Sequence, residues 1–241
     1  MRKIKILLFF TIFLSAATGY YYFYFINKNL ETKNTTEFID DGKIHIAIDA
    51  GHGGPDPGAI NTSLKIYEKN ITRKLVDAII AMADTSIYNV LQTRPRDSNI
   101  HRHQRVDLAT KFKADLMISL HCNSLTGGFL KGFEINICDS SLASDNRTSI
   151  INPNKNTNTQ FADTLSKNIG FAFPKMKNLG TRKRKDRIWV LYAPKFPSLI
   201  IEWGYINNKD DIKIIQDSLA HQILAKAVWH SIHQHFGIIK Y

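Results

Sequence analysis

The chain has 241 residues, of which 44% are hydrophobic, and a formal net charge of +11 at pH 7. This composition excludes a fibrous or wholly disordered chain and allows one ordinary globular core. The positive charge indicates a polyanionic partner, such as anionic lipid or an acidic polymer. We expect no nucleic acid, because no helix-turn-helix, zinc-finger or base-stacking signature accompanies the basic residues. The two cysteines, Cys122 and Cys138, form neither a zinc-finger spacing nor a disulfide framework.

The N-terminus carries a long apolar segment behind three basic residues. Ile6 to Ile26 are 21 residues without a charged side chain, which as a helix would extend about 31 Å and cross a bilayer. The small residues at 15–17 resemble a signal-peptide cleavage site, whereas the aromatic cluster at 20–25 favours an uncleaved signal anchor. Both alternatives export the rest of the chain to the cell envelope, in the periplasm or on the outer face of the cytoplasmic membrane.

The segments after this signal segment (1–26) are a polar linker at 27–42 and a single domain at 43–241. Apolar alternation and short apolar runs predict strands at 43–49, 88–93, 116–120, 132–138, 187–192 and 199–202. Helical spacing of apolar residues predicts helices at 68–85, at 106–114, around Phe161, Leu165 and Ile169, and at 219–232. The polar segment 139–159 predicts an exposed loop. Strands alternating with helices indicate an α/β fold with a mostly parallel sheet flanked by helices.

Two histidines and two glutamates are expected at one edge of this sheet, where parallel sheets bind ligands. His52 follows the first strand within "AIDAGHGGPDPGAI", and His121 follows the strand at 116–120 within "ISLHCNS". Glu68 begins the first long helix, and Glu202 ends the strand at 199–202. Each residue alone also has a structural explanation; for example, Glu68 interacts favourably with the helix dipole.

This set of side chains suits a catalytic zinc ion. Such an ion takes three ligands from His, Asp or Glu and keeps a fourth position for water. His52, Glu68 and His121 are the candidate ligands. Glu202 is the candidate general base and acid, which takes a proton from water and passes it to a leaving nitrogen.

The motifs resemble the zinc-dependent N-acetylmuramoyl-L-alanine amidases, hydrolases of the cell wall. "IAIDAGHGGPDPGAI", a Glu opening the next helix, "QTR", "ADLMISLHCNS", "KGFEINI" and "LIIEWGYINNKDD" occur in the order typical of that family. The resemblance extends from about Lys43 to near the C-terminus. It implies a twisted, mainly parallel sheet, zinc ligands at His52, Glu68 and His121, and catalysis by Glu202. It also implies peptidoglycan as the substrate, cut between N-acetylmuramic acid and L-alanine, with any activator protein left unidentified.

Five further residues are candidates for contacts around the ligands or with substrate. Asp49 is expected to hold a ligand histidine in one tautomer, as carboxylates near metal sites do. Arg94 and Arg105 are expected to orient carboxylates by paired hydrogen bonds, although surface ion pairs explain them as well. The remaining two candidates are Asn123, in "LHCNS", and Glu134, in "KGFEINI".

Two features depart from the family pattern. Cys122 replaces the small residue after the second histidine, and we expect its side chain to point away from the metal and pack. The segment Arg182–Arg187 is unusually basic; it either attracts anionic wall material or is only a solvated loop.

Three hypotheses follow. The chain is a zinc amidase, a membrane-tethered wall-binding module without activity, or another zinc hydrolase of wall material such as a deacetylase or peptidase. The four site residues favour the first, because a binding module does not need Glu202.

Overall fold

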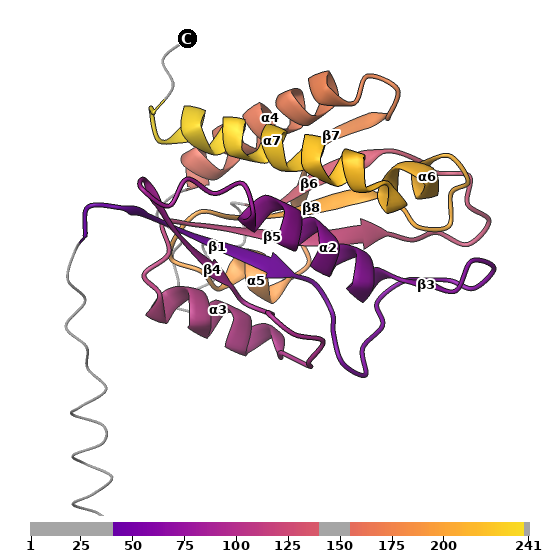
Figure 1. Cartoon of the computed structure of the whole chain (residues 1–241), viewed down its shortest axis with the longest axis horizontal. Helices are drawn as coiled ribbons and strands as arrows, with labels where there is room; N and C mark the ends of the chain where they lie inside the picture. Colours follow the sequence, from indigo (N-terminus) through magenta and orange to yellow (C-terminus); the bar gives the residue numbers. More distant parts are fainter. Residues whose placement is uncertain (1–40, 140–154, 239–241) are drawn as a thin grey trace, which may run out of the picture. The chain divides into compact units, whose positions relative to one another are not determined.

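A six-stranded sheet is the framework of the molecule (Figure 1). A computed structural model describes residues 41–139 and 155–238. The strand order is β4-β1-β5-β8-β6-β7. These strands are β1 (Ile44–Ala50), β4 (Tyr88–Gln92), β5 (Leu116–Asn123), β6 (Phe133–Cys138), β7 (Asn178–Arg184) and β8 (Ser198–Tyr205). Every neighbouring pair is parallel except β6 and β8. The predicted mostly parallel α/β fold is therefore confirmed.

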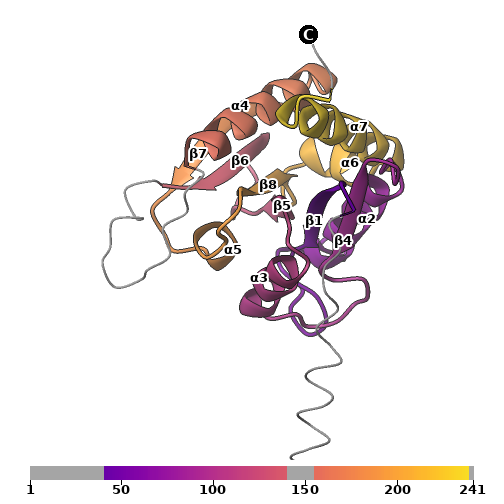
Figure 2. The same cartoon turned by 90° about the vertical axis from the view of Figure 1, so that its left-hand side faces the viewer.

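Helices cover both faces of the sheet (Figure 2). One face carries α2 (Glu68–Ile80), α4 (Lys155–Ala172) and α7 (Ser218–His235). The other face carries α3 (Arg102–Lys111) and the short α5 (Trp189–Tyr192). Two short strands, β2 (Ile60–Asn61) and β3 (Ile66–Tyr67), and the short α6 (Asp211–Gln216) complete the described elements. The apolar character of the central strands follows from this cover on both sides.

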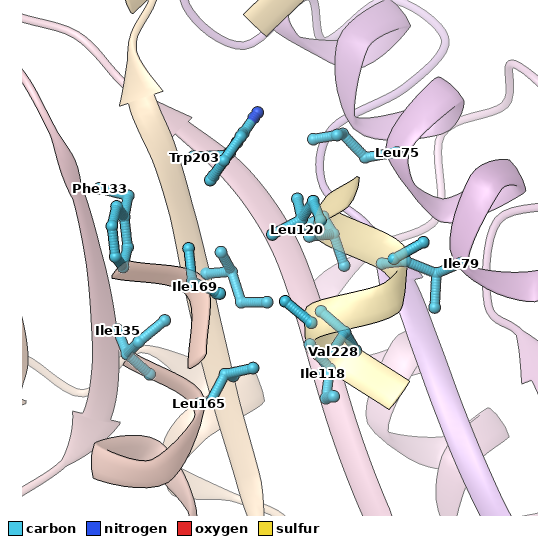
Figure 3. Close-up of a cluster of buried hydrophobic side chains, with 14 of the residues drawn as sticks. Leu75, Ile79, Ile118, Leu120, Phe133, Ile135, Leu165, Ile169, Trp203 and Val228 are labelled. Carbon is cyan, nitrogen blue, oxygen red and sulfur yellow. The ribbon is translucent and has the colours of Figure 1, made fainter. Parts of the chain in front are cut away.

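The larger core lies between the sheet and α2, α4 and α7 (Figure 3). Leu120 and Trp203 project from the sheet toward this core and are fully buried. Leu75 and Val228 meet them from α2 and α7. Because alternate strand residues face opposite sides, the intervening His121 and Glu202 face the α3 and α5 side. The core thus fixes the direction of the candidate site residues.

The strand predicted at 187–192 is wrong. Trp189–Tyr192 form a short helix, and the edge strand is β7, Asn178–Arg184, directly before it. Val190, Leu191 and Tyr192 are all buried in succession, so the apolar residues there do not alternate between two faces. Strand β7 was not predicted because its mostly exposed residues include three Arg and Lys side chains, at 182–184, and carry no apolar pattern.

Other predicted boundaries differ by a few residues. The helix predicted at 68–85 ends at Ile80 as α2. Helix α4 begins at Lys155, so the last residues of the loop predicted at 139–159 are helical, and residues 140–154 lie outside the described residues. Strands β5 and β8 extend to Asn123 and Tyr205, beyond their predicted ends.

The predicted signal segment at 1–26 and most of the linker at 27–42 also lie outside the described residues. Within 41–139 and 155–238, no helix combines the length and the apolar character needed to span a membrane.

Candidate active site

The four site residues come from separate parts of the chain. His52 follows β1, Glu68 is the first residue of α2, His121 lies in β5 and Glu202 lies in β8. His121 and Glu202 are direct neighbours across the β5–β8 pair. The parallel order of β1, β5 and β8 therefore brings these residues to one edge of the sheet, as the sequence predicted.

His52, Glu68 and His121 converge on a single point. Glu68 Oε1 lies 3.1 Å from His52 Nε2 and 3.0 Å from His121 Nδ1. One potential ligand atom from each residue lies within 4.8 Å of the others. The two imidazole rings meet edge to face, with centroids 4.9 Å apart. Two imidazoles and one carboxylate that converge in this way form the donor set of a metal site.

Backbone hydrogen bonds orient the Glu68 carboxylate. The Ala59 N–H donates to Oε2 at 2.8 Å, and the Cys122 N–H donates to Oε1 at 2.9 Å. Burial alone would raise the pKa of Glu68, but hydrogen bonds and charge from His121 and His52 outweigh burial and hold it well below its usual value. Burial would lower the pKa of His121, and its bond to Glu68 instead raises it to about 9. Glu68 is therefore ionised and ready to ligate a cation.

The arrangement of these side chains fits zinc. Zinc binds His nitrogen and carboxylate oxygen at about 2.0–2.2 Å, so tetrahedral ligand atoms lie about 3.3 Å apart. The separations of 3.0 and 3.1 Å around Glu68 Oε1 are close to that spacing. Two nitrogens and one oxygen also leave one tetrahedral position for water or substrate.

Glycines make room for this cluster. A Cβ on Gly51 would lie 2.3 Å from Cε1 of His121. A Cβ on Gly58 would lie 2.6 Å from both Glu68 Oε2 and His52 Cδ2. His52 itself has a φ of 62°, a conformation that costs energy in a residue other than glycine. The absence of side chains at Gly51 and Gly58 therefore leaves the space in which His52, Glu68 and His121 come together.

Asp56, which was not among the residues predicted for the site, supports His52. Its Oδ2 lies 2.8 Å from His52 Nδ1. An ionised carboxylate only accepts, so this contact places the ring proton on Nδ1 and leaves Nε2 for a metal. The sequence signal that could have identified Asp56 is its position four residues after His52 in the same tight loop.

Glu202 lies in a cavity of about 630 Å³ that His52 and His121 also line. Burial raises the pKa of Glu202 to about 7; the nearby Glu68 and Glu134 add to this rise, whereas the positive charges of His121 and Arg184 oppose it. A carboxyl group with a pKa near neutrality both accepts and releases protons at neutral pH. This position suits the proton-transfer role that the sequence predicted.

The role predicted for Asp49 is wrong. Its carboxylate bonds to Arg105 Nη1 at 2.7 Å, to Ser119 Oγ at 2.6 Å and to Thr93, and not to a histidine. Burial would raise the pKa of Asp49, but the charge of Arg105 and the hydroxyl hydrogen bonds outweigh burial and lower it. Asp49 therefore fixes Arg105 and two hydroxyl groups beneath the site and does not orient a zinc ligand.

The two arginines bind mainly backbone. Arg94 is fully buried and donates to the carbonyl oxygens of Ala50, Gly51 and Lys69. Arg105 donates to Asp49 and to the His52 carbonyl at 2.7 Å. Arg105 orients the carboxylate of Asp49, and Arg94 Nη1 lies 4.0 Å from the carboxylate of the exposed Asp97. Their common effect is to hold the His52 loop against the sheet.

Asn123 and Glu134 do not line the cavity with Glu202. Asn123 ends β5, and its carbonyl accepts the Ile206 N–H at 2.9 Å. Glu134 is the cross-strand neighbour of Glu202, where it accepts a bond from Asn136 and lies 3.9 Å from an Arg182 nitrogen. Glu134 therefore acts on the electrostatics of Glu202 from the adjacent strand.

Cys122 has the predicted structural role. Cys122 is buried in the larger core, with its side chain on the opposite sheet face from His121. Cys138 packs against the smaller core, and its thiol donates to the Asp139 carbonyl. Neither belongs to the donor set around Glu68.

Comparisons with known proteins point to one family. A family model described as N-acetylmuramoyl-L-alanine amidase matches residues 46–234. Similar proteins include probable N-acetylmuramoyl-L-alanine amidase AmiB of Haemophilus influenzae, 26% identical across 78% of this chain, and probable cell wall amidase LytH of Staphylococcus epidermidis, 30% identical across 80%. The chain spans 51% and 58% of the lengths of these relatives. The solved structure of N-acetylmuramoyl-L-alanine amidase AmiC2 of Nostoc punctiforme superposes with a TM-score of 0.69 at 25% identity, covering 81% of this chain and 98% of that one.

Proposed function

Because the chain belongs to the N-acetylmuramoyl-L-alanine amidase family, we propose that it hydrolyses the amide bond between N-acetylmuramic acid and L-alanine in peptidoglycan. The convergence of His52, Glu68 and His121 beside Glu202 carries this proposal. A relative that had lost activity would be free to lose these side chains, whereas this chain retains all of them on one edge of the sheet.

We propose zinc as the cofactor, held by His52, Glu68 and His121. The ionised Glu68 and the Asp56 bond to His52 prepare the donors that such an ion needs. A zinc ion bound there supplies Lewis acidity, which activates water near neutral pH and polarises the scissile carbonyl.

Glu202 moves the proton in this proposal. As the carboxylate it accepts the proton of the attacking water at one carboxyl oxygen. It then donates that proton to the nitrogen of L-alanine as the C–N bond breaks, which regenerates the carboxylate. The raised pKa of Glu202 suits both steps, because neither protonation state is strongly favoured at neutral pH.

The location and domain organisation are proposals from the sequence and the relatives. Residues 1–26 export the chain as a signal anchor or signal peptide, 27–42 form a linker, and 43–241 form the catalytic domain. The cell wall relatives support a site of action in the envelope, where peptidoglycan is the substrate. The excess of basic residues favours contact with anionic wall and membrane components.

Digestion of purified sacculi tests the proposed function. The zinc-loaded chain is expected to release stem peptides with new N-terminal alanine, which excludes a deacetylase and a passive binding module. Glu202→Gln should lower this release about 100-fold or more, because general acid–base catalysis contributes about that factor. Full activity in Glu202→Gln would contradict the role of Glu202, and fragments without N-terminal alanine would contradict amidase activity.

A further inference from the structure

Exposed apolar side chains cluster at the end of the sheet toward which β1 and β5 point (Figure 1). Two segments carry them, the β2–β3 hairpin at residues 60–67 and the β5–β6 loop at residues 124–132. Of the ten large apolar side chains exposed in the described part of the chain, five lie in these two segments. We call these five the apolar rim: Ile60, Leu64, Tyr67, Phe129 and Leu130. Single exposed apolar residues are ordinary, whereas a cluster of them marks a contact surface.

Residues 206–208, directly after β8, connect the hairpin to the loop. Asn61 Nδ2 donates to the Ile206 carbonyl at 2.9 Å. Asn208 Nδ2 donates to the Gly128 carbonyl at 2.7 Å. The hairpin and the loop therefore have a common support, and the amide groups that form it are engaged within the protein.

The register of the hairpin turns its apolar side chains toward solvent. Ile60 and Tyr67 are direct partners across the antiparallel pair, so both project from the same face. Asn61 and Ile66 project from the other face, where Ile66 packs against the larger core. Leu64, in the turn, is 53% exposed. The exposure of this face is therefore fixed by the backbone and not by the rotamer of one side chain.

The β5–β6 loop presents Phe129, which is 73% exposed. The preceding Gly128 has a φ of 62°, and a Cβ on it would lie 2.4 Å from the Asn207 carbonyl oxygen. Glycine thus lets the loop backbone contact residue 207, with Phe129 and the partly exposed Leu130 following outside this contact. Apolar side chains that project in this way suit insertion into a soft apolar layer.

The charge around the apolar rim is mainly positive. Within the hairpin, the loop and the segment 206–210, the charged side chains are three lysines and one aspartate: Lys65, Lys131, Lys209 and Asp210. Lys131 Nζ lies 3.1 Å from Asp210 Oδ2, and Lys65 and Lys209 are exposed. Lysines beside aromatic and aliphatic side chains are typical of surfaces that bind anionic lipids.

We propose that the apolar rim binds the surface of an anionic phospholipid bilayer. Leu64 and Phe129 enter the boundary between headgroups and acyl chains, and the lysines contact the phosphate groups. A glycan would need hydrogen-bonding side chains, whereas Asn61 and Asn208 bind backbone carbonyls. The export proposed for the chain gives it access to such a bilayer. Because none of the five rim residues lines the cavity at Glu202, this contact is separate from the proposed catalytic site.

Tryptophan fluorescence of the full chain in vesicles tests this inference. Phe129→Trp places an indole in the apolar rim, whereas Leu108→Trp places one at an exposed position of α3, on the other face of the sheet. In vesicles of brominated phosphatidylglycerol, an indole that reaches the acyl chains is quenched. The emission that Phe129→Trp adds to the wild-type signal should shift to shorter wavelength and be mostly lost. The emission that Leu108→Trp adds should change in neither way.

A charge substitution in the Phe129→Trp chain tests the lysines. Lys65→Gln should lower the ratio of bound to unbound rim about fivefold, which is the contribution of one lysine near an anionic surface. Lys111→Gln is the matched control, because it removes the same charge from α3 and should leave the quenching unchanged. Brominated phosphatidylcholine, which has no net charge, should quench the Phe129→Trp indole less than phosphatidylglycerol does.

Equal quenching of Phe129→Trp and Leu108→Trp would overturn the inference, because it would show only that the chain is held near the vesicle. Absence of quenching in both would also overturn it and would leave the apolar rim to a protein partner. Equal quenching by the two lipids would contradict the anionic bilayer. Purified sacculi contain no bilayer, so Lys65→Gln should digest them as the unsubstituted chain does. That assay judges the proposed function alone.

Discussion

At the scale of single residues, a buried ion pair supports the floor of the site. Asp49 is almost fully buried and binds Arg105 together with two hydroxyl groups. Arg105 in turn holds the backbone at His52. The ion pair therefore connects the stability of the fold to the position of a candidate zinc ligand.

We predict that Asp49→Asn destabilises the chain by about 3 kcal/mol at pH 7, because it leaves the buried Arg105 charge without its partner. The pKa of Asp49 is lowered in the folded state, so its contribution is fully present above the unfolded pKa of about 3.9. The contribution is lost as pH falls through the lower, folded pKa. The difference in unfolding free energy between wild type and Asp49→Asn, measured with urea, should therefore shrink below about pH 4.

The exposed Asp107 on α3 offers the control, and Asp107→Asn should lower the unfolding free energy at pH 7 far less than Asp49→Asn. A difference for Asp49→Asn that stays constant down to pH 2 would show that the ionised carboxylate contributes nothing specific.

The positions of the main site residues were predictable, and several of their contacts were not. His52, His121 and Glu202 stand at the ends of apolar strand patterns, so parallel topology alone places them together. Asp49 was assigned to a histidine because carboxylates near metal sites commonly hold a ligand histidine in one tautomer. Its side chain instead meets Arg105 and Ser119, whose positions depend on α3 and β5 and cannot be read from local spacing.

At the scale of elements, the junction between β1 and the His52 loop determines how closely the His121 ring packs against the backbone. Gly51 approaches the His121 ring so closely that no side chain fits between β1 and β5 at this point. The Gly51 N–H also donates to the Leu120 carbonyl at 3.0 Å, which keeps the two strands in register.

We predict that Gly51→Ala displaces the His121 imidazole and weakens zinc binding about 100-fold or more, a loss at least as large as that from removing a supporting residue. Competition with a chromophoric chelator measures this affinity. Gly180→Ala is the control, since a Cβ there meets nothing within 4 Å. It should cost about 1 kcal/mol of stability because its φ is 80°, and leave zinc affinity unchanged. Wild-type zinc affinity in Gly51→Ala would contradict the close packing of the ligand.

The buried strands could be predicted from the sequence, whereas the exposed edge strand could not. The central strands β1, β5 and β8 have apolar runs because helices cover both sheet faces, and all three were predicted. Edge strand β7 is mostly exposed and basic, so it lacks the pattern that identifies a strand. Helix α5 was mistaken for a strand because one helical turn is too short to show its period.

At the scale of the whole molecule, the larger apolar core and the cavity at Glu202 occupy different parts of the fold. The larger core, under α2, α4 and α7, contains the apolar sides of the central strands. The cavity lined by His52, His121 and Glu202 lies on the opposite side, next to α3 and α5. The basic residues that give the chain its net charge of +11 then favour approach to an acidic polymer.

The zinc content of the purified chain tests the central claim most directly. Elemental analysis after dialysis should find one zinc per chain in the wild type and in Glu202→Gln, which keeps every ligand. Glu68→Gln and His121→Ala should retain little zinc while circular dichroism shows that they stay folded. A wild type without zinc, or full zinc content in both ligand variants, would contradict the account.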